Sequence, residues 1–156
     1  MKFGQQAVLF FSTGFYSGNI PFAPGTFGTL AGLPFCFLVS LCPSGIGIMI
    51  IIAVIVLAVW LAGLSERLLG SKDPGCIVID EIAGMLVTLA GLPFTFFTVV
   101  LGFVLFRILD ILKPFPIRSL ERKIPGGAGI VIDDIAAGII ANGALRIILY
   151  IIDKIG

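Results

Sequence analysis

The sequence predicts an all-α protein, a polytopic integral membrane helical bundle with four to five membrane helices and a short N-terminal interfacial helix. Three observations predict it: 58% of the 156 residues are hydrophobic, the mean hydropathy is +1.17, and only 12% of the residues are charged. An ordinary soluble domain carries about 25% charged residues. We expect residues 1–156 to form a single membrane domain.

The first part of the chain alternates between apolar and helix-breaking segments. Residues 4–16 predict a short helix at the membrane interface. Residues 18–26 predict an ordered loop, because Gly and Pro at this density interrupt helices. The apolar residues 29–42 are short for a span, which needs about 20 residues. Residues 46–64 are the clearest membrane span.

Three further apolar helices are predicted in the second half of the chain. Residues 77–92 form the first, which ends at Pro93 because proline cannot continue a helix. Residues 94–112 return across the membrane, and residues 130–152 form the last helix. The number of full crossings is therefore four or five, depending on whether residues 29–42 cross the membrane.

Basic residues are unevenly distributed between the connections. Residues 65–75 and 113–129 hold six of the ten Lys and Arg residues, whereas the turns at residues 43–45 and Pro93 carry no charge. The positive-inside rule places the two basic connections in the cytoplasm. The helices that follow them should both start there.

Two nearly identical stretches place adjacent carboxylates near the start of a hydrophobic helix. Asp80 and Glu81 follow Ile-Val-Ile, and Asp133 and Asp134 follow the same three residues. Since both helices start on the cytoplasmic side, the two pairs should lie at similar depth, roughly 5 Å inside the helix starts. The returning helix brings Asp110 near the same plane. Carboxylates in apolar surroundings are costly unless compensated, so this arrangement predicts a functional site.

The chemistry of these residue types indicates a divalent metal and a phosphate. Mg²⁺ prefers oxygen ligands, and Arg107 and Lys113 would hold phosphate oxygens. Gly-rich turns at residues 73–75 and 126–129 would offer backbone N–H groups to an anion. Together they predict metal-assisted phosphoryl chemistry, with a water held by the metal or an aspartate as nucleophile. The alternative for any single acid is a favourable contact with the helix dipole.

Other function classes are narrowed by what the sequence lacks. The chain has no histidine, which excludes a Ser-His-Asp triad, a histidine-ligated metal and phosphohistidine, and its three cysteines form no metal-binding pattern. The net charge of +1 gives no reason to expect a nucleic-acid partner. A small ion- or proton-coupled membrane transporter stays open as an alternative, because buried acids can carry ions. A structural subunit would leave the paired carboxylates unexplained.

Gly84 and Gly138, which follow the acidic pairs, are expected to allow close helix packing.

Four blocks of the chain together resemble the phosphatidylglycerophosphatase A family. They are residues 24–30 (Pro-Gly-Thr-Phe-Gly-Thr-Leu), 73–84, 106–117 and 129–138, and they occur in the expected order over nearly the whole chain. The resemblance implies a Mg²⁺-dependent lipid phosphatase of the bacterial inner membrane, with its active site on the cytoplasmic side. Its substrate would be phosphatidylglycerol phosphate, a phospholipid in the bilayer, and its products phosphatidylglycerol and phosphate, in phospholipid biosynthesis.

The resemblance also implies which residues form the site, and their chemistry suggests a role for each. The metal ligands would be Asp80, Asp133 and Asp134, the catalytic residues Glu81, Asp110 and Asp134, and the substrate-binding residues Thr26, Arg107 and Lys113, with Asp73 as a further candidate. The sequence leaves open which carboxylate binds metal and which moves a proton. It also leaves open the oligomeric state.

Overall fold

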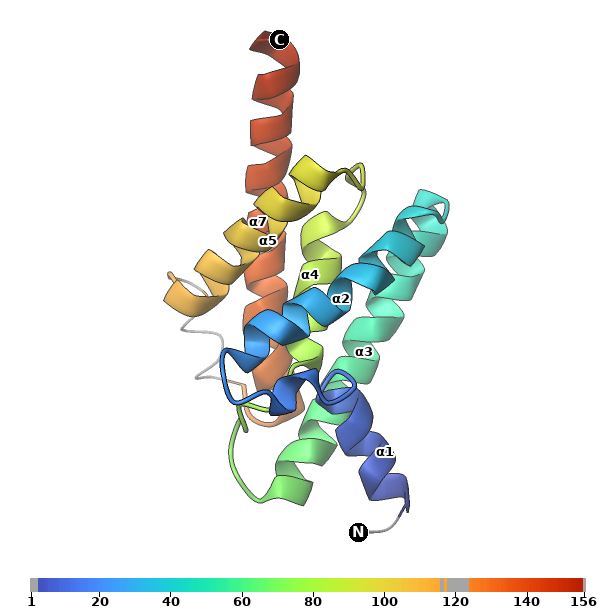
Figure 1. The fold of residues 1–156 in the computed structure, drawn as a ribbon, viewed down its shortest axis with the longest axis vertical. Coiled ribbons are helices and arrows are strands. Elements are labelled where there is room, and N and C mark those ends of the chain that lie inside the picture. The colour runs from blue at the N-terminus through green and yellow to red at the C-terminus, as the bar shows by residue number, and fades with distance from the viewer. Residues whose placement is uncertain (1–2, 116, 118–123, 156) are drawn as a thin grey trace.

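All regular secondary structure in the described part of the chain is helical, which confirms the all-α class. The structure, a computed structural model, describes residues 3–115, 117 and 124–155 (Figure 1). Its elements are α1 (Phe3–Ser12), the short 3-10 helix η1 (Ser17–Asn19), α2 (Pro24–Ser40), α3 (Ser44–Leu69), α4 (Ile79–Leu89), α5 (Phe96–Leu112) and α7 (Gly127–Ile155).

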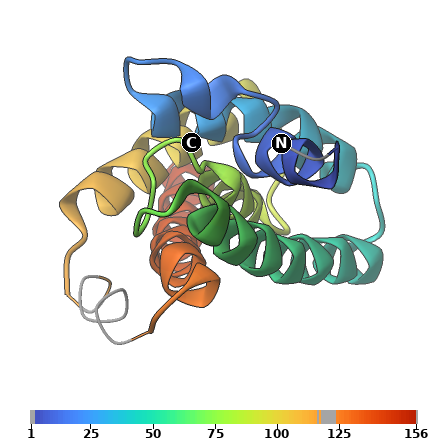
Figure 2. The same cartoon turned by 90° about the horizontal axis from the view of Figure 1, so that it is seen from below.

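Helix α4 forms the centre of the bundle. Nine of its 11 residues are buried, and it contacts α2, α3, α5 and α7. Figure 1 shows it in the middle of the bundle, and Figure 2 gives the view from below. At 1.5 Å per residue α4 is about 16 Å long, whereas the hydrocarbon core of a bilayer is about 30 Å thick. The predicted helix over residues 77–92 is therefore shorter than expected and serves as a packed core.

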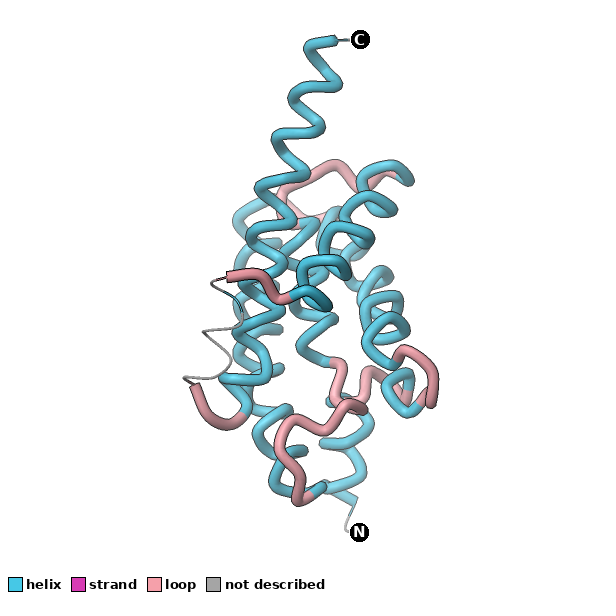
Figure 3. The backbone as a smooth tube through the Cα atoms, turned by 90° about the vertical axis from the view of Figure 1, so that its left-hand side faces the viewer, coloured by secondary structure: helices cyan, strands magenta, loops and turns pink. Residues whose placement is uncertain are grey.

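Two helices, α3 with 26 residues and α7 with 29 residues, are long and apolar enough to cross a membrane. Helices α2 and α5 have 17 residues each, which gives a length of about 25 Å. Helix α7 projects beyond its neighbours at its C-terminal end (Figures 1 and 3). A helical membrane protein thus fits the structure, and a count of four to five spans stays a prediction.

Helix α2 lies directly on the start of α4 because glycines form the contact. A Cβ atom built on Gly28 would lie under 3.0 Å from Val78, and one on Gly32 would lie 3.3 Å from Ile82 Cα. Only residues without a side chain allow the two backbones to approach so closely. The first half of α2 therefore helps to fix where α4 begins.

The expected close packing at Gly84 and Gly138 is confirmed where α4 crosses α7. A Cβ on Gly138 would lie 2.5 Å from the Gly84 carbonyl oxygen. A Cβ on Gly84 would lie 2.6 Å from the ring of Phe106, a fully buried residue of α5. The crossing brings α4, α5 and α7 together next to the acidic residues.

The Gly-rich segment at residues 126–129 differs from its prediction. Only Gly126 has the positive φ of a turn, +69°, and α7 begins at Gly127. A Cβ on Gly127 would lie under 3.0 Å from backbone atoms of Val59 and Gly63 in α3. Gly127 therefore lets α7 pack closely on α3, and the binding of an anion at this helix start stays a prediction. Because α7 begins at Gly127, Asp133 is the seventh residue of its helix rather than lying in the first turn.

The boundary between α3 and the following connection also differs from its prediction. Helix α3 continues to Leu69 and ends at Gly70, whose φ is +66°. Ser65, expected in the connection, is buried in the helix and donates a hydrogen bond to Ser12 Oγ at 2.7 Å. Helix α1 ends at Ser12, earlier than expected, and packs on α3 through this contact.

Candidate active site

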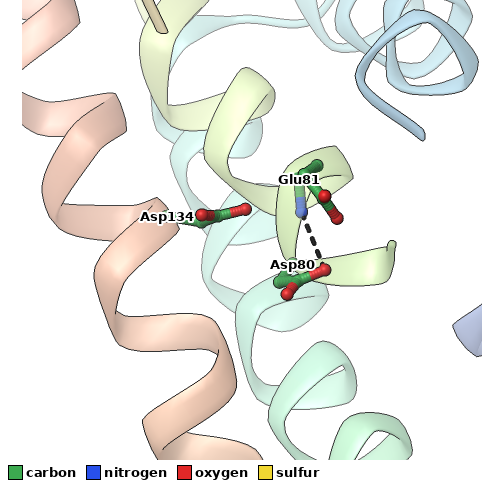
Figure 4. Close-up of side chains that lie close together, drawn as sticks. All are labelled: Asp80, Glu81 and Asp134. Atoms are coloured by element: carbon green, nitrogen blue, oxygen red, sulfur yellow. Dashed lines mark hydrogen bonds between the residues drawn. The ribbon is translucent and has the colours of Figure 1, made fainter. Parts of the chain in front are cut away.

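Five acidic residues from α4, α5 and α7 meet at the N-terminal end of α4. They form two overlapping groups, and in each group one carboxylate oxygen per residue lies within 4.8 Å of the others; the groups are Asp80, Glu81 and Asp134, and Asp110, Asp133 and Asp134. Figure 4 shows Asp134 pointing from α7 toward the two acids of α4. The predicted approach of the two acidic pairs is therefore confirmed.

The start of α4 is held in place by the N-terminal part of the chain. Asp80 and Glu81 are the second and third residues of α4, and Val78 immediately precedes the helix. The Val78 N–H donates a hydrogen bond of 2.9 Å to the carbonyl oxygen of Ser12. Three glycines leave room for the Val78 side chain, since a Cβ on any of them would lie under 3.0 Å from it: Gly14, Gly18 and Gly28. Segments that are far from Asp80 and Glu81 in the sequence therefore fix the position of the first turn of α4, which carries these two acids.

The carboxylates are buried and short of hydrogen-bond donors. Asp80, Asp133 and Asp134 are 8%, 4% and 3% exposed. Asp80 Oδ1 accepts a hydrogen bond of 3.1 Å from the Glu81 N–H. Among the described residues, Glu81 Oε2 and Asp134 Oδ2 are buried and have no hydrogen-bond partner. Buried charges that lack partners cost several kcal/mol each, so a bound cation would stabilise this cluster.

Two basic residues, both predicted to be functional, enter the cluster from α5. Arg107 donates a hydrogen bond to Asp110, one turn further along the helix, and its guanidinium lies 3.9 Å from Glu81 Oε1. Lys113 ends α5 in a left-handed conformation, with a φ of 41°, and forms an ion pair with Asp133. Each cation therefore contacts part of the acidic cluster, and both carry donors of the kind that bind phosphate oxygens.

The first turn of α2 approaches the same cluster. A Cβ on Gly25 would lie within 3.0 Å of Glu81 Oε1 and of both terminal nitrogens of Arg107. Thr26, predicted to bind substrate, follows Gly25 in this turn and is half-buried. The positive end of the α2 dipole therefore faces the acids and any bound anion. Sequence reasoning missed Gly25, although its place beside Pro24 at a helix start was a usable signal.

Asp73 is the one acidic candidate that the structure does not bring into either acidic group. It lies exposed in the connection between α3 and α4, with a φ of 46°. Together with Glu66 and Lys72 it lines a separate small depression. Asp73 and the acidic groups occupy different places in the fold.

The donor set fits a divalent cation. The five acidic residues converge through carboxylate oxygens, which are the ligands that Mg²⁺ prefers. The buried oxygens of Glu81 and Asp134 without hydrogen bonds are positions where a cation would supply the missing partner. The residues present therefore fit the magnesium ion that the sequence led us to expect.

The C-terminal end of α4 also has polar neighbours, but here they are side chains that donate hydrogen bonds to its backbone carbonyls. Asn142 of α7 donates hydrogen bonds to the carbonyl oxygens of Thr88 and Ala90, at 2.9 and 3.0 Å, and Arg146 donates to Ala90 at 2.9 Å. These bonds satisfy the carbonyls that a helix end leaves free. A cavity of about 300 Å³ lies beside Arg146, and no carboxylate lines it. Sequence reasoning missed this cap, whose signal is two polar residues four apart in an apolar helix.

Comparison with known proteins finds relatives over most of the chain. A family model described as Phosphatidylglycerophosphatase A matches residues 10–149. Phosphatidylglycerophosphatase A of Escherichia coli (strain K12) is 44% identical over 138 residues, which cover 88% of this chain and 80% of the relative. The protein of the same name from Haemophilus influenzae is 40% identical over 133 residues, 83% of this chain and 81% of the relative.

A third relative carries a different name. A protein of Bacteroides thetaiotaomicron, provisionally named a phosphatidylinositol-3-phosphatase, is 38% identical over 135 residues, 81% of this chain and 84% of the relative. No solved structure matches the chain. The family model and the two phosphatidylglycerophosphatases each cover most of the sequence, and the chain belongs to the phosphatidylglycerophosphatase A family.

Proposed function

We propose that this chain hydrolyses the terminal phosphate of phosphatidylglycerol phosphate, in a Mg²⁺-dependent reaction that gives phosphatidylglycerol and phosphate for phospholipid biosynthesis. Membership of the family makes the chain a lipid phosphatase. The observation that carries the proposal is the meeting of five buried or half-buried carboxylates with two cations at the start of α4.

Each part of the cluster has a role in this reaction. Asp80, Asp133 and Asp134 would hold Mg²⁺, which when bound neutralises phosphate oxygens and polarises the phosphorus. Arg107 and Lys113 would bind the remaining phosphate oxygens, because both already lie among the acids and carry donors suited to phosphate.

Water attack requires a base beside the phosphate. Glu81 Oε2 has no hydrogen-bond partner among the described residues, so it can accept a proton from an attacking water. Asp110 is the second candidate for this role. As the new P–O bond forms, the bond to the glycerol oxygen breaks, and that oxygen takes a proton to leave as the alcohol. Thr26 and the first turn of α2 would face the phosphate from the other side.

We place the site at the cytoplasmic face of a bacterial inner membrane, in a multi-pass domain that spans residues 1–156. Support comes from the membrane-length helices α3 and α7 and from the basic residues in the connections before α4 and α7. The lengths of α2 and α5 would allow both helices to cross a locally thinned bilayer, and α4 would carry the chain inside the bundle from the cytoplasmic end of α3 to the start of α5. In this position the acyl chains of the substrate stay in the bilayer.

The transporter alternative has less support. A pathway for cations or protons needs acidic groups at several depths, whereas five of the described acids form one cluster and Glu66 and Asp73 lie near the same end of the bundle. The comparisons also give no support to transport.

A phosphate-release assay tests the proposal. The purified full chain in detergent micelles should release phosphate from phosphatidylglycerol phosphate with Mg²⁺ and lose activity with a chelator. Phosphatidic acid and phosphatidylinositol 3-phosphate should be tested in parallel, since one relative carries the latter activity in its name. Release from none of the lipid phosphates would contradict the phosphatase proposal, and preference for another lipid would correct the substrate.

A further inference from the structure

We propose that the site holds two divalent cations at neighbouring positions, with Asp134 as a ligand to both. This inference rests on the proposed phosphatase function and adds to it the number of ions and their division between residues. It makes Glu81 and Asp110 ligands through one oxygen each, which leaves their second oxygens for the role of base. The first position is formed by Asp80, Glu81 and Asp134, and the second by Asp110, Asp133 and Asp134.

The overlap of the two acidic groups is the first reason. Each group supplies three carboxylate oxygens that lie within 4.8 Å of one another, and Asp134 is the member that both groups share. Two-metal phosphatase sites place their ions about 3.5–4 Å apart. A carboxylate has two oxygens, so Asp134 can offer one to each position.

The state of Asp134 itself is the second reason. It is only 3% exposed, and its Oδ2 atom has no hydrogen-bond partner among the described residues. Figure 4 shows its carboxylate directed from α7 at α4, toward Asp80 and Glu81, which complete the first position. A buried carboxylate oxygen without a donor is costly, and a shared cation would remove that cost on both sides.

The balance of charge is the third reason. Five carboxylates and the two cations Arg107 and Lys113 leave a formal charge of −3 in a mostly buried cluster. One divalent ion leaves −1, which would repel a phosphate monoester carrying close to two negative charges. Two divalent ions give +1 and attract it.

The basic residues divide the two positions into a strong and a weak one. Lys113 pairs with Asp133 and Arg107 with Asp110, so both non-shared ligands of the second position already have a cation. Within the described part of the chain, Asp80 of the first position forms no ion pair with a basic residue, and Arg107 lies 3.9 Å from Glu81. The first position should therefore fill first. Filling the second would free the donors of Lys113 and Arg107 for phosphate.

Binding of Mn²⁺ to the full chain in detergent, followed by electron paramagnetic resonance without substrate, tests the proposal. The wild-type protein should bind two ions in two steps and show a spin-coupled signal when both are bound. Asp80→Asn and Asp110→Asn should each bind one ion without coupling, and Asp134→Asn should weaken both steps. Glu66→Gln is the matched control, because Glu66 is an acid near the same end of the bundle that belongs to neither group. It should bind two ions.

A second variant gives a readout that a structural role would not produce. Lys113→Gln removes the cation that competes for Asp133, so it should tighten the second Mn²⁺ step by about tenfold or more, even though phosphate release falls. Size-exclusion profiles would exclude misfolding.

Saturation of the wild type at one ion, two ions in Asp110→Asn, or a weaker second step in Lys113→Gln would each overturn the proposal. Phosphate release by a protein that binds one ion would refute the second position and keep the phosphatase function. Two bound ions without phosphate release would refute the function instead.

Discussion

The two ends of α4 show opposite ways of placing polar groups inside an apolar bundle. At its start, Asp80 and Glu81 join a cluster in which buried carboxylate oxygens lack donors. At its end, the free carbonyls of Thr88 and Ala90 accept hydrogen bonds from Asn142. A satisfied polar contact stabilises a fold, whereas an unsatisfied one costs stability and persists where it has a function. The contrast predicts that changes at the start affect activity and changes at the end affect stability.

The largest expected effect is that of Asp80→Asn. Loss of one carboxylate from the first position should lower phosphate release by about 10³-fold or more, as removal of a group that stabilises transition-state charge commonly does. The melting temperature of the metal-free protein should stay the same or rise, because one of several mutually repelling charges is gone. Phosphate release and thermal unfolding, each with and without Mg²⁺, measure both. Near-wild-type phosphate release would remove Asp80 from the site.

Gly25→Ala should have the next largest effect. The new Cβ would lie within 3.0 Å of Glu81 Oε1 and the Arg107 guanidinium, so these side chains or α2 must shift. Displacement of a catalytic group by about 1 Å can cost on the order of 10²-fold in rate. Gly143→Ala in α7 is the control, because no atom lies within 4 Å of its Cβ position. Equal activity in the two variants would show that the first turn of α2 does not shape the site.

Asn142→Ala tests the other end of α4. The substitution removes the donors that Asn142 offers to the carbonyl oxygens of Thr88 and Ala90. This loss should lower the free energy of unfolding by about 1 kcal/mol. The value is at the low end for a buried hydrogen bond, because hydrogen bonds in membranes contribute little to stability. Phosphate release at a temperature where the variant is folded should be close to the wild-type rate. A large loss of activity without loss of stability would contradict the division between the two ends.

The sequence predicts the active site better than it predicts the helices that build it. The repeated Ile-Val-Ile-acid-acid pattern and the return of Asp110 identify the cluster, because carboxylates in apolar helices stand out by composition alone. The ends of the helices are harder to predict, because a glycine in the sequence is compatible both with a turn and with close packing against another helix. At Gly126 it forms a turn, and at Gly127 it packs on α3. Only the neighbouring helix distinguishes the two uses.

Outside the acidic cluster, local patterns can mark a residue that contacts a distant segment, but they do not identify its partner. Gly25 stands beside Pro24 at a helix start, yet it contacts Glu81 and Arg107 only because α2 lies across the start of α4. The cap by Asn142 has the same origin, since its partners are 52 and 54 residues away in the sequence.

The smallest expected effect is that of Asp73→Asn, which tests how far the active end extends. Asp73 belongs to the block that resembles the family, yet it lies exposed in the connection before α4 and outside both acidic groups. Asparagine tolerates its positive φ of 46° as aspartate does, so the loop should keep its shape. Catalytic efficiency should therefore stay within about twofold of wild type, as for ordinary surface substitutions. A tenfold or greater loss, measured by phosphate release from micelles, would mean that substrate reaches beyond the acidic cluster into this connection. The start of α4 would then be one part of a larger site.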